Sequence, residues 1–143
     1  PKLMDIAVPA NLRCAEPQGA TPPPEEPSWA PLTFTFAGIF EIQPQALEEH
    51  ARSIQIVDVR EPEEFTGPLG RIKGSISIPL GELPRRLDEL ARDRPVVAVC
   101  RSGARSAHAS VLLAKSGFPH VANLAGGMLR WRGEGQPVDG GRE

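Results

Sequence analysis

Two short, unbroken apolar runs constrain the fold of this chain more than any other feature. Residues 54–59 (IQIVDV) and 96–100 (VVAVC) are rich in β-branched side chains and lack the polar alternation of a half-exposed strand. Strands of this kind are buried on both faces, which is typical of parallel sheets. Residues 76–78 and 121–124 are further strand candidates.

Amphipathic segments lie between and after these runs. Three leucines at helical spacing predict a helix over residues 84–91, and further helices are predicted over residues 104–115 and around residues 128–132. Strand alternating with helix at this interval predicts an α/β fold with a central parallel sheet and helices on both faces. In such a sheet, ligands bind beyond the carboxyl ends of the strands.

The N-terminal part of the chain has a different composition. Eight of the 16 prolines lie in the first 31 residues, and residues 16–28 (EPQGATPPPEEPS) offer almost no apolar side chain to bury. This predicts a stiff, extended linker, which we place at residues 15–33, before a globular domain at residues 34–143. The alternative is an ordered arm that Trp29 and Phe34 attach to the domain.

Composition excludes several classes of protein. The 143 residues suffice for one domain, and a net charge of −2 does not suggest a nucleic-acid-binding protein, which would show a concentrated basic stripe. No apolar run approaches the ~20 residues of a membrane span, and the N-terminus lacks the basic and apolar regions of a signal peptide. We therefore expect a cytoplasmic protein with neither a nucleic-acid nor a membrane partner.

Cys100 is the candidate nucleophile. The chain has two cysteines, Cys14 and Cys100, and three scattered histidines. None of them has the spacing of metal ligands, so we expect neither a metal site nor an organic cofactor in this chain. Cys100 ends the most apolar predicted strand, and therefore lies at the edge of the sheet where ligands bind.

The residues after Cys100 suit an anion site. Gly103 allows a tight curl, which would aim loop amides inward at the positive end of the following helix. These amides and the nearby guanidinium groups favour a thiolate over a thiol, and Arg101 and Arg105 offer planar forks for sulfonate or phosphate oxygens. A buried core cysteine beside solvated or ion-paired arginines is the alternative. We predict Cys100 as catalytic and the next five residues as substrate-binding: Arg101, Ser102, Gly103, Ala104 and Arg105.

The sequence CRSGARS at residues 100–106 resembles the active-site loop of single-domain rhodaneses, the thiosulfate sulfurtransferases and their relatives. Residues 56–61 (IVDVRE), 70–80 (GRIKGSISIPL) and 126–138 (GGMLRWRGEGQPV) are similar to further motifs of that family. Within the second of these motifs, Arg71 and Lys73 stand where the family commonly has His and Pro.

This resemblance implies a rhodanese-like fold, with the active-site loop between a strand end and a helix N-terminus. It implies transfer of sulfane sulfur from thiosulfate, or from glutathione persulfide, through a Cys100 persulfide. The acceptor would be a thiol such as glutathione, or cyanide in vitro. In this family the residues matching Asp58 and Arg60 are mainly structural, so we expect both to support the site.

Two other functions remain open. Cysteine phosphatases and arsenate reductases resemble this loop but separate Cys and Arg by five residues, whereas four residues separate Cys100 and Arg105. A shorter loop forms a tighter bowl, which favours a sulfur atom over a phosphoryl group. The other alternative is a rhodanese-like docking module without catalysis, although such modules often lack the cysteine.

Residues 1–14 (PKLMDIAVPANLRC) resemble the C-terminal tail of the iron-dependent persulfide dioxygenases. The resemblance implies that this chain is the C-terminal rhodanese domain of a dioxygenase–rhodanese fusion, which acts in sulfide and persulfide metabolism. Iron would then be expected only in the upstream domain. A chance similarity is the alternative.

Overall fold

The computed structural model of the protein describes residues 29–36 and 38–141. The predicted dioxygenase-like tail, Cys14 and most of the predicted linker lie outside the described residues. Six strands form one sheet in the order β1-β2-β6-β5-β3-β4. The pair β1–β2 is antiparallel, and the other neighbouring pairs are parallel. The strands are β1 (Thr33–Phe34), β2 (Phe40–Ile42), β3 (Gln55–Asp58), β4 (Ile76–Ser77), β5 (Val96–Val99) and β6 (Val121–Leu124).

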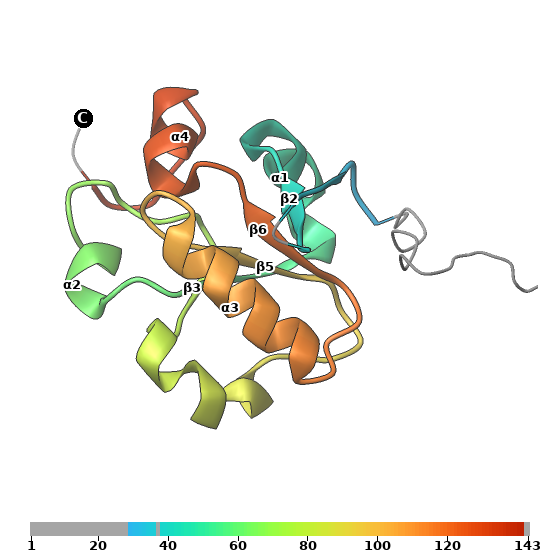
Figure 1. The fold of residues 1–143 in the computed structure, drawn as a ribbon. Coiled ribbons are helices and arrows are strands. Elements are labelled where there is room, and N and C mark those ends of the chain that lie inside the picture. Colours follow the sequence, from blue (N-terminus) through green and yellow to red (C-terminus); the bar gives the residue numbers. More distant parts are fainter. Residues whose placement is uncertain (1–28, 37, 142–143) are drawn as a thin grey trace, which may run out of the picture.

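Helices cover both faces of this sheet, as the sequence predicts (Figure 1). Side chains alternate along β5, so Val97 and Val99 join one core cluster with Leu47 and Trp131, while the side chains between them join a second cluster with Leu113. The first cluster lies under α1 (Pro44–His50) and α4 (Gly127–Gly133), and the second under α3 (Ala104–Lys115) and η2 (Leu80–Arg85). The remaining elements are η1 (Ala51–Ser53), α2 (Pro62–Phe65) and η3 (Leu87–Glu89).

The predicted α-helix over residues 84–91 is wrong, because this segment forms the two short 3₁₀ helices η2 and η3. Pro84 lies inside η2, where it provides no backbone N–H for a helical hydrogen bond. Arg86 leaves helical geometry at φ −121° and separates the two elements. Leu83 and Leu90 are nevertheless buried in the second core cluster, against which Leu87 also packs.

The packed part of the chain begins before the predicted domain boundary at residue 34. Ala30 is 8% exposed, and Trp29 and Leu32 pack against the first core cluster. Trp29, Ala30 and Leu32, which lie in the predicted linker, therefore contribute to the core, whereas Pro31 and Thr33 are exposed. Among the helices of the described residues, none is long and apolar enough to cross a membrane.

Candidate active site

The loop between β5 and α3 places Cys100 at the carboxyl edge of the sheet. Cys100 follows the last residue of β5 directly, and α3 begins four residues later at Ala104. Gly103, the residue before α3, has a φ of 110°, which side chains other than that of glycine rarely allow. The chain therefore curls back on itself, and the Gly103 amide donates to Cys100 Sγ at 3.0 Å.

Hydrogen-bond donors around Cys100 favour its thiolate. Burial raises the pKa of the Cys100 thiol. The Ser106 hydroxyl and the amides of Ser106, Gly103 and Ser102 together lower this pKa by more than burial raises it, so it lies below its ordinary value. The Ser106 hydroxyl lies 3.3 Å from Sγ, and the N-terminus of α3 adds its positive end to the same site. Cys100 itself is only 1% exposed.

Ser106 and Asn123 are site residues to which the sequence analysis assigns no role. Ser106 Oγ donates to Asn123 Oδ1 at 2.5 Å, and Asn123 Nδ2 donates to the Gly103 carbonyl at 3.3 Å. Ser106 is fully buried and Asn123 is 2% exposed. The sequence contains one indication of the role of Asn123, because it is the one polar residue in the apolar segment that forms β6 (VANL). The arrangement ties the loop and α3 to the neighbouring strand.

The start of α4 fixes the other side of the loop. The amide of Met128 donates to the Cys100 carbonyl at 2.8 Å, and that of Leu129 donates to the Arg101 carbonyl at 3.0 Å. Gly127 makes this close approach possible: a Cβ on Gly127 would lie 2.5 Å from the Cys100 carbonyl oxygen. The two carbonyls therefore face α4, on the opposite side of the sheet from the sulfur.

Replacing Gly127 by alanine is expected to destabilise the protein by about 2–4 kcal/mol and to reduce activity, because the new Cβ would push the loop backbone aside and φ there is +59°. Gly133→Ala is the matched control, since a Cβ on Gly133, in the same helix, meets nothing within 4 Å. Urea denaturation and the catalytic rate of both variants test this. Equal stabilities for the two variants would contradict a packing role for Gly127.

The two arginines of the loop differ in their partners. Arg105 donates to both oxygens of Glu64 in α2, at 2.7 and 2.9 Å. This hydrogen bonding is the main cause that lowers the pKa of Glu64 to about 2, and it raises the pKa of Arg105. Arg101 is exposed and has no ion pair among the described residues. The guanidinium of Arg105, which the sequence predicts to bind an anionic substrate, is thus already paired with a carboxylate. The guanidinium of Arg101 is available to a substrate.

A pocket of about 320 Å³ lies beside the loop and includes Arg101. Glu64 and Arg60 add charged groups to its wall, and Pro68 and Leu69 add an apolar side. The remaining two predicted binding residues, Ser102 and Ala104, lie exposed on the loop and at the start of α3. Cys100 does not line this pocket, but Arg101 makes the pocket a space beside the loop in which a small anion could bind.

Asp58 and Arg60 form a buried ion pair at the end of β3. Arg60 Nη2 lies 2.7 Å from Asp58 Oδ2, Arg60 Nε donates to Oδ1 at 2.9 Å, and both side chains are 1% exposed. Arg60 Nη2 also donates to the Gly70 carbonyl at 2.8 Å. The pair connects β3 to the turn that leads to the pocket wall, a position that suits the supporting role expected of it.

The turn that departs from the family pattern is held by its backbone. The amide of Arg71 donates to the Asp139 carbonyl at 3.0 Å, and the amide of Asp139 donates to the Arg71 carbonyl at 2.8 Å. The Arg71 guanidinium lies over the Phe65 ring, 5.2 Å from its centroid. Arginine is therefore accommodated at this position by a cation–π contact.

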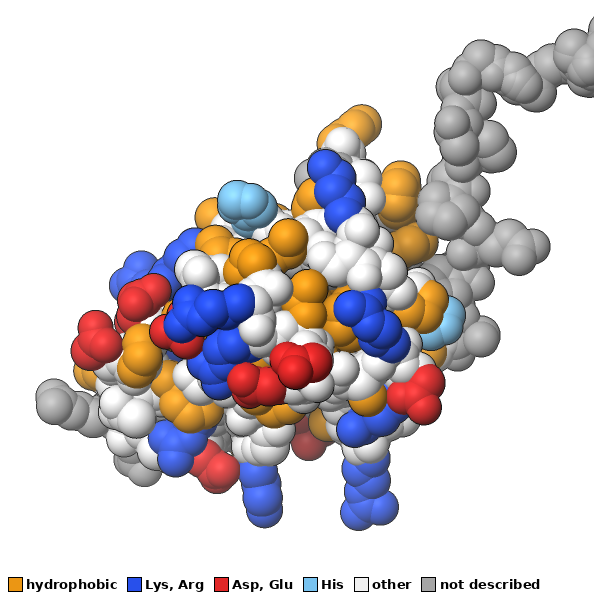
Figure 2. Space-filling model, turned by 90° about the horizontal axis from the view of Figure 1, so that it is seen from below, with side chains coloured by type: hydrophobic (Ala, Val, Ile, Leu, Met, Phe, Trp, Pro, Cys, Tyr) orange, Lys and Arg blue, Asp and Glu red, His pale blue; other side chains and the backbone are white. Residues whose placement is uncertain are grey.

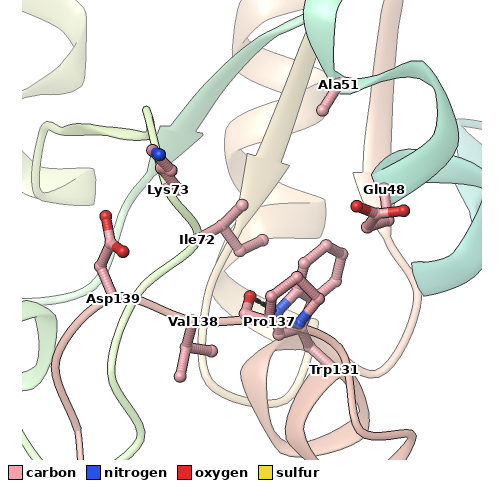
Figure 3. Close-up of a pocket in the computed structure, with 8 residues that line it drawn as sticks. All are labelled: Glu48, Ala51, Ile72, Lys73, Trp131, Pro137, Val138 and Asp139. Atoms are coloured by element: carbon pink, nitrogen blue, oxygen red, sulfur yellow. Dashed lines mark hydrogen bonds between the residues drawn. The ribbon is translucent and has the colours of Figure 1, made fainter.

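A second pocket, of about 250 Å³, is lined mainly by apolar side chains and contains no residue of the Cys100 loop. Figure 3 shows Glu48 on one side of it and Lys73 and Asp139 on the other, with Ile72 and Trp131 between them. The Trp131 indole donates to the Pro137 carbonyl at 2.9 Å, so the pocket wall is held by the C-terminal segment. Among the described residues, no cysteine, serine or threonine lines this pocket, and the Cys100 loop remains the candidate active site.

Basic and acidic side chains are interspersed on the face that Figure 2 shows. This face therefore lacks the continuous basic surface by which proteins bind nucleic acids. Within residues 29–36 and 38–141, no group of three His, Cys, Asp or Glu side chains could hold a metal ion.

Comparisons with known proteins agree with this fold. The model of the rhodanese-like domain family matches residues 43–134. A sulfurtransferase of Allochromatium vinosum is 36% identical over 101 residues, which are 68% of this chain and 92% of that protein. An uncharacterized protein of Bacillus subtilis, YqhL, is 42% identical over 83 residues, which are 58% of this chain and 64% of YqhL.

A solved structure of a rhodanese-related protein from Thermoplasma volcanium aligns with a TM-score of 0.65 and 35% identity, covering 69% of this chain and 96% of that one. The chain therefore belongs to the rhodanese-like domain family, and its relatives include sulfurtransferases.

Proposed function

We propose that the chain is a thiosulfate sulfurtransferase, which carries sulfane sulfur on Cys100 between a donor and a thiol acceptor. The observation that carries this proposal is the thiolate-favouring site of Cys100, where the Gly103 amide and the Ser106 hydroxyl both contact Sγ. The donor would be thiosulfate or glutathione persulfide. The chemistry uses the side chains of this chain and needs neither a metal nor an organic cofactor.

In the first step the Cys100 thiolate attacks the outer sulfur of thiosulfate. A new S–S bond forms on Cys100, the S–S bond of thiosulfate breaks, and sulfite leaves with the electron pair. Arg101 would hold the sulfonate oxygens and stabilise the departing charge. The loop amides, of which that of Gly103 donates to Sγ, would then stabilise the persulfide anion.

In the second step an acceptor thiolate, such as that of glutathione or another small thiol, attacks the outer sulfur of the persulfide. The S–S bond to Cys100 breaks, and the Cys100 thiolate is regenerated together with a new persulfide. In vitro, cyanide would take the same sulfur. Neither step requires an external oxidant or reductant.

The site supports a phosphatase or arsenate reductase less well. Those enzymes use the arginine of the loop to hold a tetrahedral oxyanion, whereas both oxygens of Glu64 engage the fork of Arg105. A docking module would need neither a thiolate-favouring sulfur nor the hydrogen bonds that Cys100 receives. Sulfur transfer is therefore the function that the geometry supports best.

Intact-protein mass spectrometry after incubation with thiosulfate tests the proposal, and glutathione is added afterwards. The expected result is a gain of one sulfur atom on Cys100, which glutathione removes; a Cys14→Ser protein, used as the control, should behave identically. No gain without reductant would exclude thiosulfate as the donor. Glutathione persulfide and an aryl phosphate would then be offered, and a phosphoryl group retained on Cys100 would support the phosphatase alternative instead.

Replacing Arg101 by alanine is expected to raise the KM for thiosulfate about tenfold, because a charged hydrogen bond to the sulfonate is lost at a partly solvated site. Arg85→Ala is the control, since Arg85 is 70% exposed and makes only an exposed ion pair with Glu82. Initial rates over a range of thiosulfate concentrations separate KM from kcat. An unchanged KM would show that Arg101 does not bind the donor.

We also propose that the parent protein is cytoplasmic and carries a persulfide dioxygenase domain upstream. The support is the similarity of residues 1–14 to the tail of that enzyme class, together with the effective concentration that a tether gives a labile persulfide. Sequencing the coding region upstream of Pro1 tests the fusion. A reading frame without the ligands of an iron site would contradict it.

A further inference from the structure

The hydroxyl of Ser106 lies between two hydrogen-bond acceptors. Its oxygen is 3.3 Å from Cys100 Sγ and 2.5 Å from Asn123 Oδ1. A hydroxyl has one hydrogen, so it cannot donate to both acceptors at once. Ser106 is fully buried and Asn123 is 2% exposed, so the hydroxyl hydrogen is shared between these two protein acceptors rather than with solvent.

The orientation of the Asn123 amide is fixed by Gly103. Asn123 Nδ2 donates to the Gly103 carbonyl at 3.3 Å. If the amide were reversed, Asn123 Oδ1 would face the Gly103 carbonyl oxygen. Both atoms are acceptors, so this hydrogen bond would be lost. Asn123 therefore presents its oxygen, an acceptor, to Ser106.

We infer that Asn123 is a positioning residue that competes with Cys100 for the single hydroxyl hydrogen of Ser106, so that this hydroxyl changes its acceptor when Cys100 ionises. In the thiol form, Cys100 donates to Ser106 Oγ, and Ser106 donates to Asn123. In the thiolate form, the sulfur only accepts, and the Ser106 hydrogen turns to it. The inference deepens the proposed function and rests on Cys100 as the nucleophile.

Ionisation of Cys100 therefore removes a donor from a buried carbonyl oxygen. Asn123 Oδ1 loses its hydrogen bond from Ser106, and that loss opposes the stabilisation which Ser106 gives to the thiolate. The two residues have opposite effects on the same proton equilibrium. When Cys100 carries the transferred sulfur, the charge lies on the outer atom, and the Ser106 hydroxyl returns to Asn123.

Charged groups near the sulfur act separately from this arrangement. They come from the loop and α3, from the carboxylates at the start of α2, and from the ion pair at the end of β3: Arg101, Arg105, Glu61, Glu64, Asp58 and Arg60. The strand that carries Asn123 contributes no charged side chain. The charged side chains have no hydrogen bond with Ser106 or Asn123 in the described residues, so a change at Asn123 reaches Cys100 either through the Ser106 hydroxyl or through the Gly103 backbone, which Asn123 also contacts.

The test is the pH profile of Cys100 alkylation by iodoacetamide, measured without any sulfur donor. Every protein carries Cys14→Ser, so that one thiol reacts. Asn123→Leu keeps a similar volume without the acceptor, and is expected to lower the pKa of Cys100 and to raise its thiolate fraction about threefold to tenfold at a pH below the pKa. Ser106→Ala is expected to raise the same pKa.

The double variant Ser106→Ala/Asn123→Leu separates this role from a structural one. With no hydroxyl present, Asn123→Leu should leave the pKa of Cys100 unchanged. An equal shift in both backgrounds, or a raised pKa in Asn123→Leu alone, would overturn the inference. Circular dichroism checks the folding of each variant, and Asn123→Ala replaces Asn123→Leu, with the same expected signs, if the latter does not fold.

Failure of sulfur transfer would not be confused with failure of this inference. The alkylation profile reports only the protonation of Cys100, whereas the mass of the thiosulfate-treated protein reports the transfer. If the coupling is found and no sulfur is gained, the proposed function falls and the role of Asn123 remains.

Discussion

Replacing Cys100 by alanine is expected to reduce sulfur transfer to the background rate while the protein stays folded. In a double displacement the transferred sulfur must be bound covalently, and no other described residue offers a thiol. The structural change is small, since alanine fills most of the space of a buried cysteine at the end of β5. The thiosulfate-to-glutathione rate and the melting temperature of the variant are the measurements.

Two further variants make this result specific. Cys100→Ser keeps an acceptor for the Gly103 amide and the Ser106 hydroxyl, which contact Sγ at 3.0 and 3.3 Å, but replaces the thiolate with a poor nucleophile. It should therefore be folded and inactive. Cys14→Ser should retain full activity. Retained transfer in both Cys100 variants, or loss of transfer in Cys14→Ser, would contradict Cys100 as the single nucleophile.

The strands of the sheet and helix α3 could be predicted because the pattern of apolar residues in their sequences matches the burial of those residues in the fold. β5 is a continuous apolar strand, β6 is apolar except for Asn123, both have largely buried side chains, and α3 has the predicted bounds, Ala104–Lys115. The segment after β4 could not be predicted in the same way. Its leucine spacing is that of an α-helix, but Pro84 lies inside the first turns and lacks the backbone N–H that an α-helix would use, and the segment forms two short 3₁₀ helices.

In the candidate site, too, residues that are contiguous in sequence could be predicted, and residues that are distant in sequence could not. The loop from Cys100 onward is contiguous in sequence, so its residue types alone indicated a nucleophile and its donors. Glu64, which holds Arg105, is 41 positions away, and Asn123 is 17 positions from Ser106. Such partners are brought together by the order of strands in the sheet. No local pattern specifies them, and they became visible only with the fold.

Loss of the Asp58 carboxylate is expected to destabilise the domain by about 3–5 kcal/mol, because Asp58→Ala leaves a buried guanidinium without its counter-charge. Arg60 is 1% exposed. Without Asp58, the hydrogen-bond acceptor left to its guanidinium among the described residues is the Gly70 carbonyl. A loss of this size is a large share of the roughly 5–15 kcal/mol that stabilises a typical domain. Urea denaturation of the variant gives the free energy of unfolding directly.

Two comparisons show whether the unpaired charge is the cause. Asp93→Ala removes an exposed carboxylate that has no ion pair in the described part of the chain, and should change stability by less than about 0.5 kcal/mol. Asp58→Leu/Arg60→Met replaces both charges with apolar groups and should recover much of the loss, because no buried charge remains. If Asp58→Ala costs no more than Asp93→Ala, the pair does not stabilise the end of β3. If the double variant is stable but its kcat for sulfur transfer falls, the ion pair also positions the pocket wall beside Cys100.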